Sequence, residues 1–250
     1  MPRYRLDVEF DGTPFVGWQR QDNGPSVQGA LEDAGAALSQ SPAVAVGAGR
    51  TDSGVHAFAM TAHIDLAKPF DEETVRDGLN AQMRPAPISV LSARAVGEDF
   101  HARFSCTRRH YLYRILNRRS PAALDKTRVW QVPGPLDETA MSDAAAYLVG
   151  KHDFTTFRSV NCQSASPLKT LSHIEVMREG EEIVLRLHAP SFLHNQVRSI
   201  AGTLVQVGLG RWSPGDVKSA LDATNRARCG PVAPAHGLYF VKADYPAELT

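Results

Sequence analysis

Strict alternation beside a glycine-rich turn constrains the fold of this chain most. After the turn, Phe58, Met60, Ala62 and Ile64 fall on one face of the chain and polar residues fall on the other, which predicts a β-strand. Before the turn, the short apolar and β-branched run at 43–46 predicts another strand. The turn between the two strands reads Gly49-Arg50-Thr51-Asp52-Ser53-Gly54-Val55-His56-Ala57.

We call residues 49–57 the Asp52 loop. Its glycines allow the backbone to bend tightly and to come close to a ligand. A loop on a rigid sheet would then present the carboxylate of Asp52 and the guanidinium of Arg50, and reactive groups are often placed in this way. Asp-Ser-Gly is also ordinary turn chemistry, so local composition alone leaves a purely structural turn open.

Two other motifs overlap this loop. Gly47-Ala48-Gly49 could open a dinucleotide-binding G-x-G-x-x-G sequence, but Asp52 stands at the third glycine, where a carboxylate would repel a pyrophosphate. Asp52-Ser53-Gly54 has the form of an aspartic-protease motif. That chemistry needs two carboxylates that share a proton, and the sequence contains no second Asp-Thr/Ser-Gly.

The composition is that of a globular chain without net charge. Its 250 residues are 43% hydrophobic and 22% charged, with 27 basic and 27 acidic residues, so no overall positive charge indicates nucleic acid. Of the basic residues, 21 are Arg and 6 are Lys. Arg suits bidentate phosphate contacts, although a GC-rich genome gives the same bias.

Several classes of protein are disfavoured by simple features. Three cysteines, far apart, predict neither a disulfide framework nor a zinc site. The N-terminal residues show no signal-peptide core. The apolar run at 197–209 contains Arg198, Thr203 and Gln206 and is too polar for a membrane span. We therefore expect a reduced, cytoplasmic protein without a metal, a cofactor or a membrane partner.

The order of expected elements in residues 1–100 is β-α-β-β-α-β, the ferredoxin-like order. Strands are expected at 4–10, 43–46, 58–65 and 88–95, with helices behind the caps Ser26 and Asp71. Residues 101–250 are expected to repeat this order, with strands at 105–116, 171–177, 183–187 and 238–241 and with helices that open at Asp137 and Ser191. The predicted fold class is α+β. Two ferredoxin-like halves would form one broad, mostly antiparallel sheet with helices on one face and a central cleft on the other.

An acid-free window runs from Phe100 to Leu124. It holds six arginines, namely Arg103, Arg108, Arg109, Arg114, Arg118 and Arg119. Such a patch attracts a polyanion without sequence preference, whereas the structural alternative is a solvated strand face. Tyr111 and Tyr113 alternate within the window and share a sheet face; one of them could stack on a base. In the last expected helix, Arg198 flanks the apolar stripe, either as a surface cation beside the core or as a cation aimed at a carboxylate.

Motifs in register over nearly the whole chain resemble the tRNA pseudouridine synthase A family. They are the Asp-Gly…Gly-Trp-Gln-Arg-Gln loop at 11–21, Ser26-Val27-Gln28-Gly29, the Asp52 loop, Phe100-His101-Ala102-Arg103-Phe104, residues 109–113, His152-Asp153-Phe154, Phe192-Leu193-His194 with Val197-Arg198, and residues 233–239. Mild departures from the family pattern occur at Phe10, Phe15, Gln196 and Phe240. None of them touches the chemistry that the resemblance implies.

The resemblance implies an enzyme that isomerises uridine to pseudouridine at positions 38–40 in the anticodon arm of tRNA, and that acts as a homodimer. By the same resemblance, Asp52 is the catalytic nucleophile, Tyr111 stacks on the target base and Arg198 pairs with Asp52. Arg50 would hold the phosphate backbone or fill the space of the flipped base. For the acid-free window, we expect phosphate contacts from Arg108, Arg109, Arg118 and Arg119.

Two functions from other classes stay open on the sequence. A non-catalytic RNA-binding protein with tandem ferredoxin-like units would explain the fold and the arginines, but it leaves Asp52 without a role. An aspartic-protease-like hydrolase would explain Asp52-Ser53-Gly54, but neither the arginines nor the helices. Release of tritium from C5-labelled uridine in tRNA would separate the synthase from both.

Overall fold

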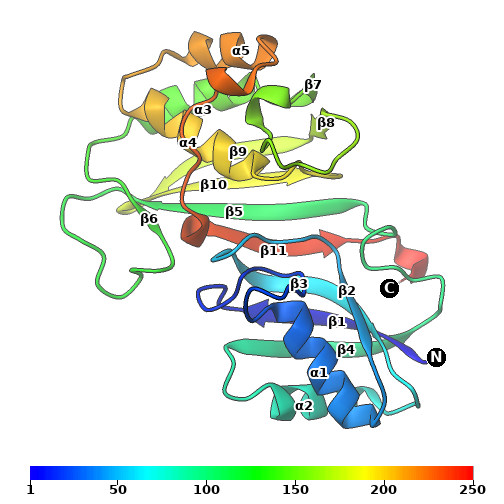
Figure 1. Cartoon of the computed structure of the whole chain (residues 1–250). Coiled ribbons are helices and arrows are strands. Elements are labelled where there is room, and N and C mark those ends of the chain that lie inside the picture. The colour runs from blue at the N-terminus through cyan, green and yellow to red at the C-terminus, as the bar shows by residue number, and fades with distance from the viewer. Residues whose placement is uncertain (250) are drawn as a thin grey trace. The chain divides into compact units, whose positions relative to one another are not determined.

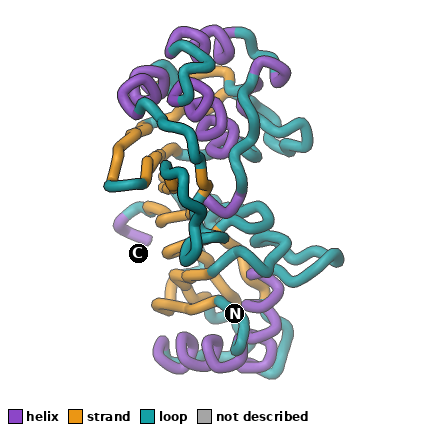
Figure 2. Tube along the Cα trace, turned by 90° about the vertical axis from the view of Figure 1, so that its left-hand side faces the viewer, coloured by secondary structure: helices purple, strands orange, loops and turns teal. Residues whose placement is uncertain are grey.

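The computed structural model describes residues 1–249, which form a mixed α+β structure with a large, mostly antiparallel sheet and five α-helices (Figure 1). The predicted α+β class is confirmed. The chain divides into two compact units: unit 1 comprises residues 1–109 and 239–250, and unit 2 comprises residues 110–238. Within each unit the helices gather to one side of the strands (Figure 2).

Unit 1 has the predicted ferredoxin-like order. Its elements are β1 (Arg3–Phe10), α1 (Val27–Ser39), β2 (Val44–Gly47), β3 (His56–Asp65), α2 (Glu72–Met83), β4 (Ile88–Val96) and β11 (Leu238–Asp244), whose first residue falls in unit 2. Strand β1 pairs antiparallel with both β3 and β4, and β2 pairs antiparallel with the second half of β3. The first two residues of β3 pair instead with β11, in parallel.

The core of unit 1 follows the alternation read from the sequence. In β1, Tyr4, Leu6, Val8 and Phe10 are buried, while the residues between them are partly or fully exposed. The side chains of Ser26 and Asp71 cap α1 and α2 by accepting backbone N–H bonds, as predicted. Helix α1 packs closely on β3: a Cβ added at Gly35 would lie only 2.7 Å from the Ile64 side chain. Helix α2 packs on β4 and against α1, so the two helices cover one face of the unit 1 strands.

Unit 2 contains two small groups of strands and three α-helices. Its elements are β5 (Arg108–Leu116), whose first two residues belong to unit 1, β6 (Trp130–Gln131), α3 (Glu138–Ala146), β7 (Gly150–Asp153), β8 (Leu168–Leu171), β9 (His173–Glu179), β10 (Glu182–Ala189), α4 (Gln196–Gly208) and α5 (Pro214–Asp222). Strands β9 and β10 form an antiparallel hairpin, and β7 pairs with β8. The expected strands, and the helix capped by Asp137, are confirmed within a few residues.

The start of the last predicted helix was wrong. Helix α4 begins at Gln196, not near Ser191, because Asn195 takes a left-handed conformation at its N-cap with φ of 62°. Helix α5 and the β7–β8 pair were not predicted. They lie between the elements of the repeat and do not disturb their order.

The compact units differ from the expected halves, 1–100 and 101–250. The boundary falls inside β5, and the closing strand β11 belongs to unit 1 through its parallel pairing with β3. Such a pairing joins residues about 180 positions apart, which no local pattern encodes. Across residues 1–249, none of the helices has the length and apolar character needed to cross a bilayer.

Candidate active site

The Asp52 loop is held in place by the loop that follows β1. Trp18 N–H donates to the Thr51 carbonyl at 3.0 Å, and the Ser53 hydroxyl donates to the Phe15 carbonyl at 3.1 Å. The Asp52 backbone also forms an antiparallel bridge with Gly17. A backbone bond before Asp52 and a bond from the Ser53 side chain after it therefore hold its Cα in place, while Asp52 stays partly exposed to solvent.

Close approach of the two loops requires glycine at position 17. Its φ is +122°, and a Cβ there would lie 2.5 Å from the Thr51 carbonyl oxygen. Trp18, which is buried next to it, packs its ring against the backbone at Gly47, at the end of β2. The loop at 11–21 is thus the frame that positions the carboxylate.

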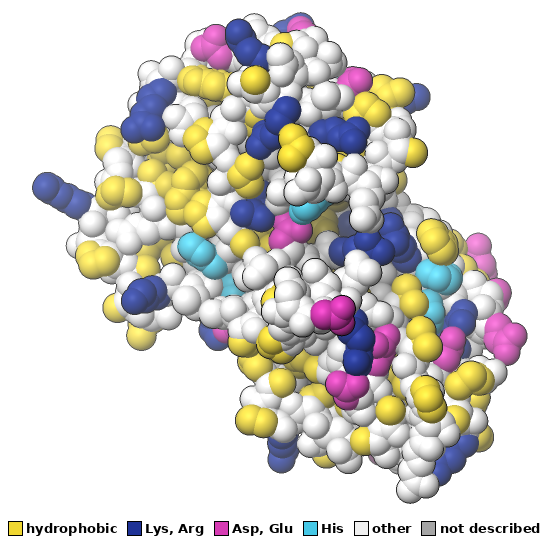
Figure 3. Space-filling view, viewed as in Figure 1, with side chains coloured by type: hydrophobic (Ala, Val, Ile, Leu, Met, Phe, Trp, Pro, Cys, Tyr) yellow, Lys and Arg dark blue, Asp and Glu magenta, His cyan; other side chains and the backbone are white. Residues whose placement is uncertain are grey.

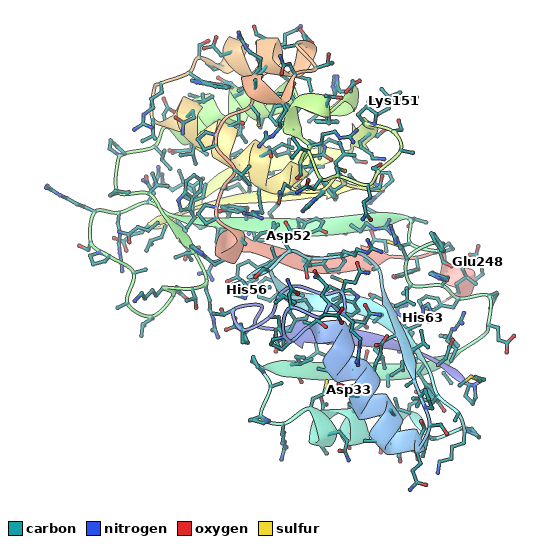
Figure 4. The ribbon with its side chains drawn as sticks, in the orientation of Figure 1. Asp33, Asp52, His56, His63, Lys151 and Glu248 are labelled. Atoms are coloured by element: carbon teal, nitrogen blue, oxygen red, sulfur yellow. The ribbon has the colours of Figure 1, made fainter. Side chains whose placement is uncertain are left out.

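A buried histidine at the end of the Asp52 loop also bonds to the loop at 11–21. His56 is 2% exposed, and its Nδ1 accepts the backbone N–H of Gly12 at 3.0 Å. Because an amide N–H can only donate, Nδ1 carries no proton in this bond, although the Asp11 carboxylate lies 3.2 Å away. The His56 ring stacks on Tyr239 at 4.9 Å between centroids. Figure 4 shows Asp52 and His56 near one end of β3 and His63 farther along it.

Three guanidinium groups gather in unit 1, and we call them the unit 1 arginine group: Arg50, Arg103 and Arg109. Arg50 is exposed in the Asp52 loop. The guanidinium of Arg109 donates to the Ala48 carbonyl at 2.9 Å and to the Arg103 carbonyl at 2.6 Å. Partial desolvation, together with the charges of Arg50 and Arg109, lowers the pKa of Arg103. Positive charge is therefore concentrated beside the loop that carries the carboxylate.

In unit 2, the two tyrosines of β5 have different environments. The Tyr113 ring is fully buried and its hydroxyl donates to the Pro234 carbonyl at 2.7 Å, so Tyr113 is a core residue whose pKa burial raises. Tyr111 is partly exposed and meets Phe192 edge to face, with 5.1 Å between the ring centroids. Of the two, Tyr111 is the tyrosine that is partly exposed to solvent.

Arg198 stands in the first turn of α4 and is partly exposed. Its Nε donates to the Ala233 carbonyl at 2.8 Å and its Nη1 donates to Asn195 Oδ1 at 2.9 Å. The Ala233 N–H donates to the Arg198 carbonyl at 3.1 Å. One turn farther along α4, a Cβ on Gly202 would lie 1.8 Å from the Pro231 carbonyl oxygen, so residues 231–233 pack closely on the helix. These bonds orient the guanidinium, and a guanidinium of fixed orientation suits a bidentate contact with a carboxylate.

The comparisons with known proteins agree with these motifs. The family model described as tRNA pseudouridine synthase matches residues 8–105 and 144–246. The protein named tRNA pseudouridine synthase A in Maricaulis maris is 58% identical over 98% of this chain and 99% of its own length. Proteins of the same name in Afipia carboxidovorans and Sinorhizobium fredii are 58% and 56% identical, each over 98% of this chain and 100% of their own length.

The chain belongs to the tRNA pseudouridine synthase family. The resemblance carried by the sequence motifs is confirmed. The proposed residues of this family member lie in both units, with Arg50 and Asp52 in unit 1 and Tyr111 and Arg198 in unit 2.

The acid-free window of this family member is not an acid-free surface. Three of its arginines pair with acidic residues from distant segments: Arg108 with Asp244 at 3.8 Å, Arg114 with Glu182 at 2.7 Å, and Arg118 with Glu181 at 2.8 Å. Arg109 instead donates hydrogen bonds to two backbone carbonyls, those of Ala48 and Arg103. Arg119 is exposed. Phosphate contacts by the four predicted arginines stay a prediction.

Sequence reasoning missed the two buried histidines of β3. His63, which is 3% exposed, accepts the Ala102 N–H through Nδ1 at 3.0 Å, just as His56 accepts that of Gly12. Each histidine anchors one surface loop to the same strand. A signal was present for His63, because a histidine on the polar side of an alternating strand faces whatever covers that side.

Proposed function

We propose that this protein isomerises uridine to pseudouridine in the anticodon arm of tRNA, at positions 38–40, with Asp52 as the catalytic nucleophile. Membership of the tRNA pseudouridine synthase family carries the proposal. The Asp52 loop supports it, because its backbone is fixed by bonds from Phe15, Gly17 and Trp18 while the carboxylate stays accessible.

The reaction moves one glycosidic bond within a single nucleotide. The N1–C1′ bond breaks, the uracil turns, and a C5–C1′ bond forms; the proton on C5 is released and N1 gains one. No electrons are gained or lost overall. A carboxylate can attack C1′, attack C6, or promote loss of uracil, and its anionic form is the reactive one in each case.

The other residues have separate tasks in this proposal. The bond being broken lies inside a stacked arm, so the target nucleotide must be flipped out. Tyr111 stacks on the flipped base and helps to remove a proton, while Arg50 holds the backbone or fills the vacated space. Arg198 pairs with Asp52 and keeps it ionised, since a nearby guanidinium lowers a carboxyl pKa by about 1–3 units. Arg108, Arg109, Arg118 and Arg119 contact phosphates.

We also infer that the enzyme works in the cytoplasm as a homodimer, as the family resemblance implies. A homodimer would have twice the 27.2 kDa mass of the chain. Light scattering after gel filtration measures this mass directly.

Tritium release from C5-labelled uridine in an unmodified tRNA transcript tests the function. Each uridine isomerised releases one tritium to water, so release establishes the synthase. Transcripts with uridine at only one of positions 38, 39 and 40 then define the sites. Binding of tRNA without release would favour the non-catalytic RNA-binding protein. Peptide hydrolysis without RNA binding would favour the protease-like alternative.

A further inference from the structure

An aromatic ring stands exposed beside the unit 1 arginine group. Phe104 is 78% exposed to solvent, although Phe100, four residues earlier in the same segment, is 1% exposed. We propose that Phe104 is a stacking platform for an unpaired base of the bound RNA, a different base from the target uridine that reacts at Asp52. The proposal rests on the proposed function, because it names how the same RNA substrate is held.

The segment that carries Phe104 is rigid. The backbone N–H groups of Arg103 and Phe104 both donate to His101 Nδ1 at 3.2 Å. Just before them, the Ala102 N–H donates to His63 Nδ1 at 3.0 Å and the Ala102 carbonyl accepts the Tyr245 hydroxyl at 2.6 Å. Just after them, the Ser105 N–H donates to the His101 carbonyl at 2.9 Å. A ring that projects from a fixed backbone loses little conformational entropy when it binds, which favours its use as a platform.

The Phe104 ring is flanked by the partners that base stacking uses. The His101 ring lies 4.4 Å from it between centroids, and the Arg103 guanidinium lies 5.8 Å from its centroid. Single-stranded nucleic acid is commonly held by aromatic side chains for the bases and by cations for the backbone. Phe104 and Arg103 supply both in adjacent residues.

The arginines place this platform next to the proposed chemistry. Arg109 is bonded to the Ala48 carbonyl, just before the Asp52 loop, and to the carbonyl of Arg103. Arg50, two residues before Asp52, acts electrostatically on Arg103. In Figure 3 most Lys and Arg side chains are scattered over the face in view, and one compact cluster of them lies to the right of centre with histidine beside it. A nucleotide on Phe104 would therefore be a neighbour of the one at Asp52.

The charge around Phe104 favours RNA over a protein partner. An exposed phenylalanine alone could equally contact a protein. Here the Arg103 guanidinium lies 5.8 Å from the ring centroid, Arg109 is bonded to the Arg103 carbonyl, and the charge of Arg50 acts on Arg103. Such a concentration of like charge is stabilised by a polyanion. The ring is therefore set for a ligand that has both flat bases and phosphates.

Equilibrium binding of an unmodified tRNA transcript to Phe104 variants tests the platform. Stacking on an aromatic side chain contributes roughly 1–3 kcal/mol per base, so Phe104→Ala should weaken binding by roughly 5- to 150-fold. Phe104→Leu should lose most of that affinity and Phe104→Tyr should keep it. Leu91→Ala, at a half-exposed apolar residue on β4 of the same unit, is the matched control and should bind as wild type does.

Salt dependence and fluorescence separate stacking from charge. Phe104→Ala should leave the slope of log affinity against log salt unchanged, whereas Arg103→Ala should reduce it by roughly 1. In Phe104→Trp, the added fluorescence should be quenched when tRNA binds.

The proposal is overturned if Phe104→Ala binds tRNA as tightly as wild type, or if Phe104→Leu fully replaces the ring. A change of oligomeric mass in Phe104→Ala, with tRNA affinity intact, would assign the ring to a protein contact instead. Tritium release by the wild-type protein is measured separately. Loss of the platform and failure of the proposed function therefore give different results.

Discussion

Acid should lower the free energy of unfolding, and His63, which holds the loop that carries Phe104, is one reason. Its ring is 3% exposed, and desolvation, followed by the charge of Arg3, lowers its pKa to about 4 from 6.5. The neutral Nδ1 also accepts the Ala102 N–H, a bond that a proton on Nδ1 would break. His63 is thus neutral in the folded state over a pH range in which it is charged in the unfolded state.

The direction and the size of the pH effect on the free energy of unfolding follow from proton linkage. Between pH 6.5 and about pH 4 the unfolded chain binds a proton at His63 that the folded chain does not, so stability falls as the pH falls through this window. With about 1.4 kcal/mol per pKa unit, the contribution of His63 to the loss between pH 7 and pH 5 is about 2 kcal/mol. Below pH 4 both states are protonated and the contribution levels off.

Two measurements test this argument. In the folded protein, the imidazole carbon-bound proton signals of His63, followed by NMR, should titrate near pH 4. In urea unfolding from pH 7 to pH 5, wild type should lose about 2 kcal/mol more than His63→Asn, which keeps an acceptor near the position of Nδ1 but cannot be protonated there. A His63 signal that titrates near pH 6.5, or parallel stability curves for the two proteins, would refute the reasoning.

The other predictions concern the site and its frame. Gly17→Ala should cost roughly 1–3 kcal/mol of stability and lower kcat/KM by about 100-fold, because its Cβ would lie 2.5 Å from the Thr51 carbonyl oxygen. The control is Gly180→Ala, at a φ of +61° with open space around it, which should leave kcat/KM unchanged. Arg198→Ala should abolish most single-turnover reaction at neutral pH while tRNA affinity is kept, and Arg198→Lys should recover little; a wild-type rate in Arg198→Ala would give Asp52 another partner. Replacing Arg108 and Arg119 together by Ala should flatten the salt slope of tRNA binding by roughly 1–2. Arg109→Ala should also lower the unfolding free energy, because its guanidinium staples two carbonyls. An unchanged salt slope would make Arg108 and Arg119 a solvated face.

Local patterns in the sequence were enough to predict the framework of unit 1. The alternation in β1 and β3 and the caps Ser26 and Asp71 act within a few residues, and the structure confirms them. The parallel pairing of β11 with β3 is a contact between distant segments, so no window of sequence shows it.

The same limit applies to the site. Asp52 and Arg50 could be predicted as site residues because one continuous motif carries them. The acid-free window suggested bare positive charge, but acidic residues from β10, from the turn before it and from β11 return to pair with Arg114, Arg118 and Arg108. The start of α4 was misplaced because a left-handed Asn195 has no strong local signal.

The most direct test of the account is single-turnover tritium release by Asp52→Asn, with tRNA affinity measured on the same preparation. The substitution keeps the shape of the side chain and its ability to accept a hydrogen bond but removes the nucleophilic anion. We expect release to fall by a factor on the order of 10⁴ or more, as when a catalytic nucleophile is lost, while affinity stays within about tenfold. Residual release near one tenth of the wild-type rate would contradict the assignment of Asp52 as the nucleophile.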